Sequence, residues 1–282
     1  MPSCAGRSFP KVAALADDPA PGFRRWALKL EYDGTGLVGW QRQNNGVSVQ
    51  ELLESAAARL IGGRPLSSAT AGRTDAGVHA AGMVVQLDLP DDAVTDARQI
   101  RDGISFHLKP HRVAILAAAP AAPGWHARFS ATSRAYRYTI LNRPTRPVLQ
   151  MNHVWHVRRP LDVEAMREGA ALLIGRHDFS SFRAAACQAS GPVRTLDVLD
   201  VRREGEIVTI DAMARSFLHH QVRNLAGSLQ LVGIGQWSPA KLGAVLAACD
   251  RRQAGPTAPS EGLCLTAVGY PADPFSAGTS AS

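Results

Sequence analysis

The sequence predicts an α/β protein of the α+β kind, in which two ferredoxin-like halves form one mainly antiparallel sheet with helices on one face and a groove on the other. In the first half, strand and helix patterns follow in the order β-α-β-β-α-β. A linker with Pro120, Pro123 and Gly124 comes next, and the same kind of pattern then recurs. Since 45% of the 282 residues are apolar and 20% are charged, the chain can bury the core that such a sheet needs.

The linker divides the chain into a predicted N-terminal α/β subdomain, residues 25–122, and a predicted C-terminal α/β subdomain, residues 123–272. Residues 1–24 are rich in Ala, Pro and Asp without apolar periodicity, which predicts a disordered leader. Residues 273–282 are predicted to be a disordered tail. The sequence contains no secretory signal and no apolar run that could span a bilayer, so no membrane partner is expected.

The first half opens with a predicted strand over Trp26–Tyr32, where apolar and polar side chains alternate. Ser48 and Glu51 form a capping box, which predicts the start of a helix that runs to about Leu60. The remaining patterns predict strands over 67–71, 83–87 and 112–118 and a helix over 95–106.

The second half begins with a predicted strand over Tyr136–Leu141, and Asp162 is expected to cap a helix that runs to about Leu173. Strands over 196–201 and 207–213 form a predicted hairpin, and a helix follows over 217–232. Ser238 and Pro239 start a further helix, since proline is favoured at the first helical position. A strand over 263–268 closes the fold.

The formal net charge of +7 indicates a polyanionic partner, although a solvated basic surface would give the same value. Only four of the 31 basic side chains are lysines, and arginine suits bidentate phosphate contacts. The four cysteines are widely spaced, so they predict neither a disulfide framework nor a structural zinc site. This cysteine usage fits a cytoplasmic protein.

Gly34-Thr35-Gly36-Leu37-Val38-Gly39 satisfies the Gly-x-Gly-x-x-Gly fingerprint of dinucleotide binding. The fingerprint requires a helix that begins within the glycines and receives the pyrophosphate at its N-terminus. Here a polar loop follows, and the helix starts only at Ser48. The alternative assignment as a nucleotide-dependent oxidoreductase would therefore depend on this segment alone.

The decapeptide Ala71–Ala80 concentrates charge in a glycine-bounded connection between two predicted strands. Asp75 lies at its centre, and Arg73 can approach the Asp75 carboxylate and keep it ionised. An ordinary surface turn is the alternative, because Asp-x-Gly is common turn chemistry.

The segment Gly72–His79 resembles the signature loop of the tRNA pseudouridine synthase A family. Further blocks between about Trp26 and Tyr270 are similar to that family's blocks and follow in its order. These blocks are Tyr32–Gly34, Gly39–Gln43, His126–Ala131, Tyr136–Tyr138, Asp178–Phe179, Ser181–Arg183, His219–His220, Val222–Asn224 and Glu261–Leu263. Such a series is far more specific than any single motif.

The resemblance implies an isomerase that converts uridine to pseudouridine at positions 38–40, in the anticodon stem-loop of tRNA. It implies the pseudouridine synthase fold, with RRM-like halves and an RNA-binding cleft. Asp75 would be the nucleophile, with Tyr136 and Arg223 as further catalytic residues and with Arg73, Tyr136 and Leu263 binding the substrate. The family also implies a homodimer that binds tRNA rather than DNA, with no cofactor and no metal.

Each of these residues also has a purely structural interpretation. Tyr136 could pack in the core, as we expect for Tyr138, and Leu263 would otherwise be an ordinary strand leucine. Arg223 lies in an apolar helix pattern, where it either needs an anionic partner or extends to the surface. Asp75 is the partner that the resemblance supplies.

The histidines predict no metal site. His219 and His220 are neighbours within a predicted helix, so their side chains should diverge by about 100° and not share an ion. His79 and His126 could contact RNA, but solvated loop histidines are the simpler interpretation. A non-catalytic RNA-binding module remains the alternative function, although it does not explain a carboxylate within a basic site.

Overall fold

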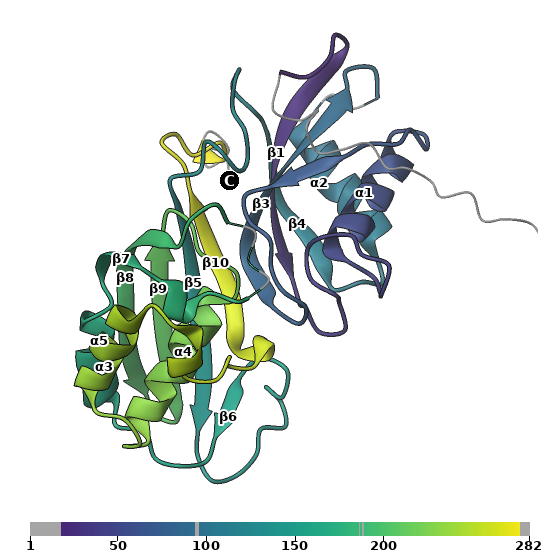
Figure 1. Ribbon diagram of the computed structural model, residues 1–282. Coiled ribbons are helices and arrows are strands. Elements are labelled where there is room, and N and C mark those ends of the chain that lie inside the picture. The colour runs from purple at the N-terminus through teal and green to yellow at the C-terminus, as the bar shows by residue number, and fades with distance from the viewer. Residues whose placement is uncertain (1–17, 94–95, 186, 188, 277–282) are drawn as a thin grey trace, which may run out of the picture.

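The computed structural model describes residues 18–93, 96–185, 187 and 189–276 (Figure 1). Within this part of the chain, eight strands form a continuous sheet in the order β4-β1-β3-β10-β5-β9-β8-β7, and two short strands pair beside this path. The strands are β1 (Phe23–Tyr32), β2 (Ser68–Thr70), β3 (His79–Pro90), β4 (Val113–Pro120), β5 (Ser133–Asn142), β6 (Trp155–Val157), β7 (Gly175–Asp178), β8 (Val193–Glu204), β9 (Ile207–Ala214) and β10 (Leu263–Gly269). The pairs are antiparallel except for β10 with β3 and β5 with β6, which confirms the predicted class.

The N-terminal half has the predicted β-α-β-β-α-β order. Helices α1 (Val49–Leu60) and α2 (Ala97–Leu108) pack with β1, β3 and β4 around one hydrophobic core. The Ser48 hydroxyl accepts a hydrogen bond from the Glu51 backbone N–H at 3.2 Å, which confirms the predicted cap of α1. Asp96 caps α2 in the same way through Gln99.

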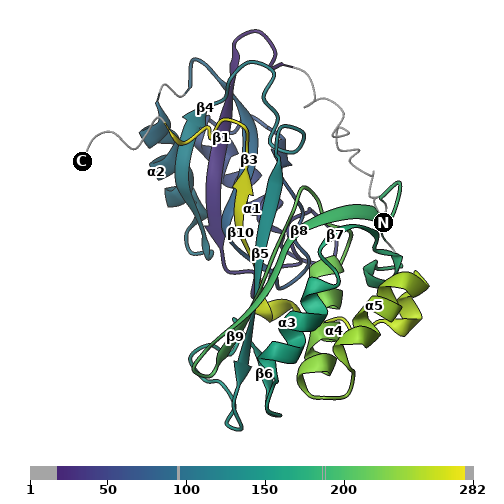
Figure 2. The ribbon, with the colours of Figure 1, turned by 90° about the vertical axis from the view of Figure 1, so that its left-hand side faces the viewer.

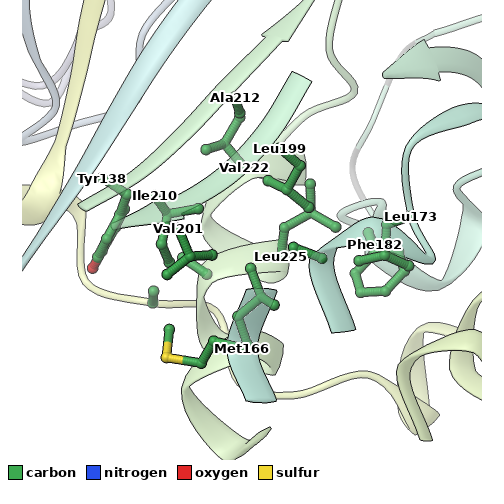
Figure 3. Packing of buried hydrophobic residues seen from close by; sticks show 14 of the residues in the cluster. Tyr138, Met166, Leu173, Phe182, Leu199, Val201, Ile210, Ala212, Val222 and Leu225 are labelled. Carbon is green, nitrogen blue, oxygen red and sulfur yellow. The ribbon is translucent and has the colours of Figure 1, made fainter. Parts of the chain in front are cut away.

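The C-terminal half carries α3 (Val163–Ala171), α4 (Gln221–Gly233) and α5 (Pro239–Ala248). Asp162 and Pro239 take the predicted positions at the starts of α3 and α5. Side chains from these helices and from β5, β8 and β9 form a second core, in which Tyr138, Met166 and Val222 lie together (Figure 3). Sequence patterns did not predict the short strands β6 and β7.

Strand β10, from the end of the chain, joins the two halves (Figures 1 and 2). It pairs in parallel with the start of β3, where Leu265 lies opposite Ala80, and antiparallel with β5, where Leu265 lies opposite Tyr136. The loop 71–78 leads directly into β3. This seam therefore brings the loop that carries Asp75 close to the strand that carries Tyr136.

At the seam, the side chains of β5 indicate which face of the sheet lies beside the helices. Tyr136 and Tyr138 share one face of β5, and Tyr138 is buried under α3 and α4 (Figure 3). Tyr136 thus points to the face that carries the helices, and it contacts both cores. Because α1 and α2 belong to one core and α3, α4 and α5 to the other, the seam between them remains the place where a site can form.

Part of the predicted leader, residues 1–17, and part of the predicted tail, residues 277–282, lie outside the described residues. Phe23 and Arg24, placed in the leader by the sequence analysis, already belong to β1. The division into two subdomains remains a prediction, and the separate cores of the two halves support it.

Candidate functional site

The loop 71–78 is held by strands and by neighbouring backbone. The Trp40 backbone N–H donates to the Thr74 carbonyl at 3.0 Å, and the Tyr32 and Thr74 hydroxyls share a hydrogen bond of 2.8 Å. Val78, at the end of the loop, is buried in the core of the C-terminal half. The loop thus connects two strands of one half while its end is anchored in the other half.

The glycines around Asp75 have a structural role. Gly39 has a φ of +99°, and a Cβ atom there would lie 2.6 Å from the Thr74 carbonyl oxygen. Gly77 has a φ of +78°, and its Cβ would lie 2.6 Å from the Ser260 hydroxyl. Gly39 therefore supports the Asp75 loop at close range, which gives the Gly-x-Gly-x-x-Gly segment a function other than nucleotide binding.

The Asp75 carboxylate faces Arg223 from α4. Arg223 Nη1 donates to Asp75 Oδ2 at 3.2 Å, and Arg223 Nε donates to the Ala258 carbonyl at 2.8 Å. The Arg223 side chain is 15% exposed and that of Asp75 is 23% exposed. The buried arginine has the anionic partner that its apolar surroundings required, and the second hydrogen bond fixes the direction of the guanidinium.

Both His219 and His220 also face Asp75, which corrects the sequence analysis. His219 Nε2 lies 3.3 Å from Asp75 Oδ1, and His220 Nε2 lies 3.4 Å from Oδ2. The predicted divergence is wrong because α4 begins at Gln221, four residues later than expected. His220 takes a left-handed φ of 61° before the helix, and the two ring centroids are 4.0 Å apart.

His220 favours the neutral form. Burial lowers the pKa of His220, the negative charge of Asp75 opposes this shift, and the positive charges of His219 and Arg223 add to it. A neutral imidazole has a lone pair that can accept a proton or bind a metal ion.

Tyr136 lies beside the loop and across the seam. Its ring packs edge-on against Phe217 with centroids 5.3 Å apart, and a Cβ atom on Gly72 would lie 4.0 Å from its hydroxyl oxygen. Burial, followed by the negative charge of Asp75, raises the pKa of Tyr136. Among the described residues no hydrogen bond engages this hydroxyl, so it can serve a ligand.

Arg73 does not have the predicted contact. No ion pair joins it to Asp75 in the described part of the chain, and its side chain is exposed. Partial burial, together with the positive charge of Arg128, lowers the pKa of Arg73. A spacing of two residues in an irregular loop thus does not by itself bring the two charged groups together.

Leu263 is the first residue of β10 and lies opposite Tyr138, buried in the core of the C-terminal half. The hydroxyl of Tyr138 donates to the Pro259 carbonyl at 2.7 Å, so this tyrosine is structural as predicted. Leu263 and Leu265 point to the same face of β10 as Tyr136 and Tyr138 do on β5. Because Leu263 is buried in this core, it could contact a bound base only from the core side of the site.

His79 and His126 are buried, so their interpretation as solvated loop residues is wrong. His126 Nδ1 accepts from the backbone N–H groups of Arg128 and Phe129 at 3.0 and 3.3 Å. His79 Nδ1 accepts from the Gly34 N–H at 3.0 Å, and its Nε2 lies 2.8 Å from the Asn152 carbonyl. The imidazoles of both histidines thus hold neighbouring backbone segments in place.

Two groups of described residues have the donor atoms for a metal ion: Asp75 with His219 and His220, and Asp33 with His79 and His153. The first group surrounds the candidate nucleophile. A carboxylate on a fixed loop, an arginine against it and a tyrosine hydroxyl nearby can form and release a covalent bond to a substrate carbon.

Comparison with known proteins finds similar chains in one family. A family model described as tRNA pseudouridine synthase matches residues 170–271, a range that includes Arg223 and Leu263 but not Asp75. A tRNA pseudouridine synthase A from Gluconobacter oxydans (strain 621H) is 64% identical over 264 residues, which cover 94% of this chain and 96% of the relative. Proteins of the same name from Acidiphilium cryptum (strain JF-5) and Paramagnetospirillum magneticum (strain ATCC 700264 / AMB-1) are 62% and 54% identical, covering 89% and 88% of this chain and 98% and 96% of the relatives.

Proposed function

Since this chain belongs to the tRNA pseudouridine synthase A family, we propose that it isomerises uridine to pseudouridine in the anticodon stem-loop of tRNA, with Asp75 as the nucleophile. The isomerase class and the tRNA substrate follow from family membership. The observation that supports the role of Asp75 is its carboxylate, which is held against Arg223 on a loop fixed by both halves.

A uracil within a stacked helix is out of reach of Asp75, so the nucleotide has to be flipped out of the stack. Asp75 would then attack either the ribose anomeric carbon or the base and form a covalent intermediate. The glycosidic C–N bond breaks, the base turns, and a C–C bond to the same ribose carbon replaces it. The bond to Asp75 is released again, the base carbon loses its proton and the freed ring nitrogen gains one, so no external oxidant or reductant is consumed.

The neighbouring side chains divide the remaining tasks. Arg223 positions the carboxylate, because its guanidinium is itself fixed by the Ala258 carbonyl. Tyr136 would assist removal of the proton from carbon and stack on the base. Leu263 would support the base from beneath, and Arg73, which is exposed and lies apart from Asp75, would contact the opened stack or its phosphates.

Phosphate contacts have a candidate site near the seam. A hollow of about 310 Å³ is lined by Arg176, Arg194 and Arg215 together with Val193, Thr195 and Ser216. Nε of Arg194 is buried without a hydrogen-bond partner among the described residues. Ser216 precedes Phe217, which contacts Tyr136, so a backbone phosphate bound here would lie close to the reacting nucleotide.

The working unit would be a homodimer in the cytoplasm. A folded tRNA is large beside one chain with a net charge of +7, and two subunits double the basic surface. The three described cysteines are free, which suits a reducing compartment. No helix in the described residues is long and apolar enough to cross a membrane.

The decisive experiment incubates the purified chain with transcribed tRNA in buffer without cofactors and then maps pseudouridine by nucleotide position. We expect pseudouridine in the anticodon stem-loop. A protein that binds tRNA but leaves every uridine unchanged would favour the non-catalytic RNA-binding module. Modification confined to another part of the tRNA would overturn the assignment of the stem-loop.

A second experiment tests the mode of binding. Sedimentation should show a dimer of the free protein, and tRNA affinity should fall steeply with added salt, because arginine–phosphate contacts release counterions. Changing the bases that flank the target uridine should matter little. A monomer whose binding depends on sequence and not on salt would contradict the proposal.

A further inference from the structure

We propose that Asp75, His219 and His220 form a binding site for a first-row transition-metal ion such as Zn²⁺, and that the bound ion blocks the nucleophile. The binding site stands on the geometry of these three residues alone. Its inhibitory consequence rests on the proposed function, because a carboxylate oxygen that ligates a metal ion cannot attack a carbon atom.

The distances within the cluster fit one ion. The ligand atoms of the three residues all lie within 4.8 Å of one another, and the two contacts to the carboxylate are 3.3 Å and 3.4 Å. Zinc bonds to nitrogen and oxygen are about 2.0–2.1 Å long, which separates neighbouring corners of a tetrahedron by about 3.3–3.4 Å. The 3.3 Å between His219 Nε2 and Asp75 Oδ1 therefore matches one edge of such a site, and His220, whose 3.4 Å contact is to Oδ2, lies near enough to turn toward the same ion.

The same distances do not correspond to hydrogen bonds. Among the described residues no hydrogen bond joins either imidazole to Asp75, although both Nε2 atoms are close enough for an ion pair. In a tetrahedral site each ring nitrogen points at the central ion, about 35° away from its neighbouring ligand atom, so close contacts without hydrogen bonds are compatible with a metal site. The left-handed backbone at His220 holds the two rings together before α4 begins.

Arg223 should weaken the binding of a metal ion, but it leaves one carboxylate oxygen of Asp75 available as a ligand. Its guanidinium contacts Oδ2, whereas Oδ1 is the oxygen that His219 approaches. A cation can therefore bind Oδ1 and His219 in their present positions, and His220, which now lies 3.4 Å from Oδ2, has to turn toward the same ion. Water would take the fourth position, as in zinc sites with three protein ligands. The nearby positive charge should keep binding weaker than in a dedicated structural zinc site. His219 is 42% exposed and His220 29%, so solvent ions can enter.

The second cluster in the chain is a matched control. Asp33, His79 and His153 have the same donor types, but Arg112 already binds Asp33 at 2.7 Å and both ring nitrogens of His79 are engaged. A metal ion there would have to break these bonds. The cluster around Asp75 has no such obstacle on either imidazole.

The test uses the full chain in metal-free buffer and titrates it with Co²⁺ as a spectroscopic probe, followed by displacement with Zn²⁺. We expect one Co²⁺ per chain with the intense absorption of tetrahedral Co²⁺. His219→Asn and His220→Asn should each weaken binding by about tenfold or more, while His153→Asn should leave it unchanged. Asparagine is chosen because it tolerates the left-handed backbone at position 220.

An activity measurement follows on the same proteins. Zn²⁺ should inhibit pseudouridine formation by wild type, chelation by EDTA should restore it, and whatever activity each histidine variant retains should be less sensitive to Zn²⁺. Absence of Co²⁺ binding, binding that survives both histidine substitutions, or equal loss in His153→Asn would overturn the inference. If Co²⁺ binds as expected but the metal-free protein forms no pseudouridine, the metal site stands and the proposed function fails.

Discussion

The described part of the chain contains two clusters of one aspartate and two histidines whose aspartates differ in their hydrogen bonds. Asp33 accepts hydrogen bonds from the Thr35 hydroxyl at 2.6 Å and from Arg112 at 2.7 Å, and its side chain is 14% exposed. The Asp75 carboxylate accepts one hydrogen bond among the described residues, from Arg223, and otherwise has only ion contacts with two histidines.

The difference shows how a carboxylate becomes structural or reactive. The side chains of Asp33 and His79 both serve the fold. Together they hold the loop after β1 against the start of β3 and the segment near Asn152. Asp75 keeps Oδ1 without a hydrogen bond from the described residues, on a loop whose backbone is itself rigid. Composition and residue types cannot distinguish the two clusters, whereas their hydrogen bonds can.

The largest expected effect is on Asp75 itself. Asp75→Asn should abolish pseudouridine formation while tRNA affinity stays within a few-fold of wild type, because the change removes a nucleophile and no phosphate contact. Single-turnover assays and filter binding would measure the two quantities. The matched variant Asp33→Asn should remain active under conditions where it is folded. Comparable loss of turnover in both variants would remove the distinction drawn between the clusters.

Tyr136→Phe should lower kcat by about 10²- to 10⁴-fold with little change in KM. The ring and its edge contact with Phe217 remain, but the hydroxyl that no described residue engages is lost. Steady-state kinetics on tRNA would show the split. Tyr138→Phe is the control, since its hydroxyl binds the Pro259 carbonyl and should affect stability rather than turnover. A normal kcat in Tyr136→Phe would exclude the hydroxyl from proton transfer.

Each cluster also has an arginine that can be removed. Arg223→Ala should reduce kcat by about 10²-fold, since the Asp75 carboxylate loses the donor that positions it. Arg112→Ala should leave kcat unchanged and cost at most about 1 kcal/mol in the free energy of unfolding, because Arg112 is 74% exposed. Kinetics and chemical denaturation of both variants test this contrast. A wild-type kcat in Arg223→Ala would contradict it.

The smallest expected effect of a substitution is on the free energy of unfolding and on how it depends on pH. Burial alone would raise the pKa of Asp33, but hydrogen bonds from the Thr35 hydroxyl, Arg112 and the Thr35 backbone lower it well below its usual range. A carboxyl whose folded pKa is depressed contributes stability above its unfolded pKa of about 4, and this contribution is lost as the pH falls below that value.

Asp33→Asn should therefore cost about 1–3 kcal/mol at neutral pH. The difference from wild type should stay constant down to about pH 5 and shrink from about pH 4 downward. Urea denaturation at several pH values would measure it. A difference that grows on acidification would contradict the role of the Asp33 hydrogen bonds.

Local sequence determined the α+β class, the order of the main strands and helices, the caps at Ser48 and Asp162 and the start of α5 at Pro239. These features depend on periodicity and on side-chain–backbone bonds within a few residues, so neighbouring residues suffice to specify them. The similarity of short blocks to a known family pointed to Asp75, Tyr136 and Arg223 as one site. Their roles in catalysis remain proposals.

Only the tertiary structure decided how these residues meet. Asp75 and Arg223 are 148 positions apart, and their contact exists because β10 closes the seam between the two halves. The late start of α4 allows both His219 and His220 to face Asp75, and Arg73 forms no ion pair with Asp75 in the described part of the chain. Spacing along the chain fixes side-chain directions only within a regular helix or strand, and these residues lie in irregular loops, where long-range packing sets the backbone and hence the chemistry.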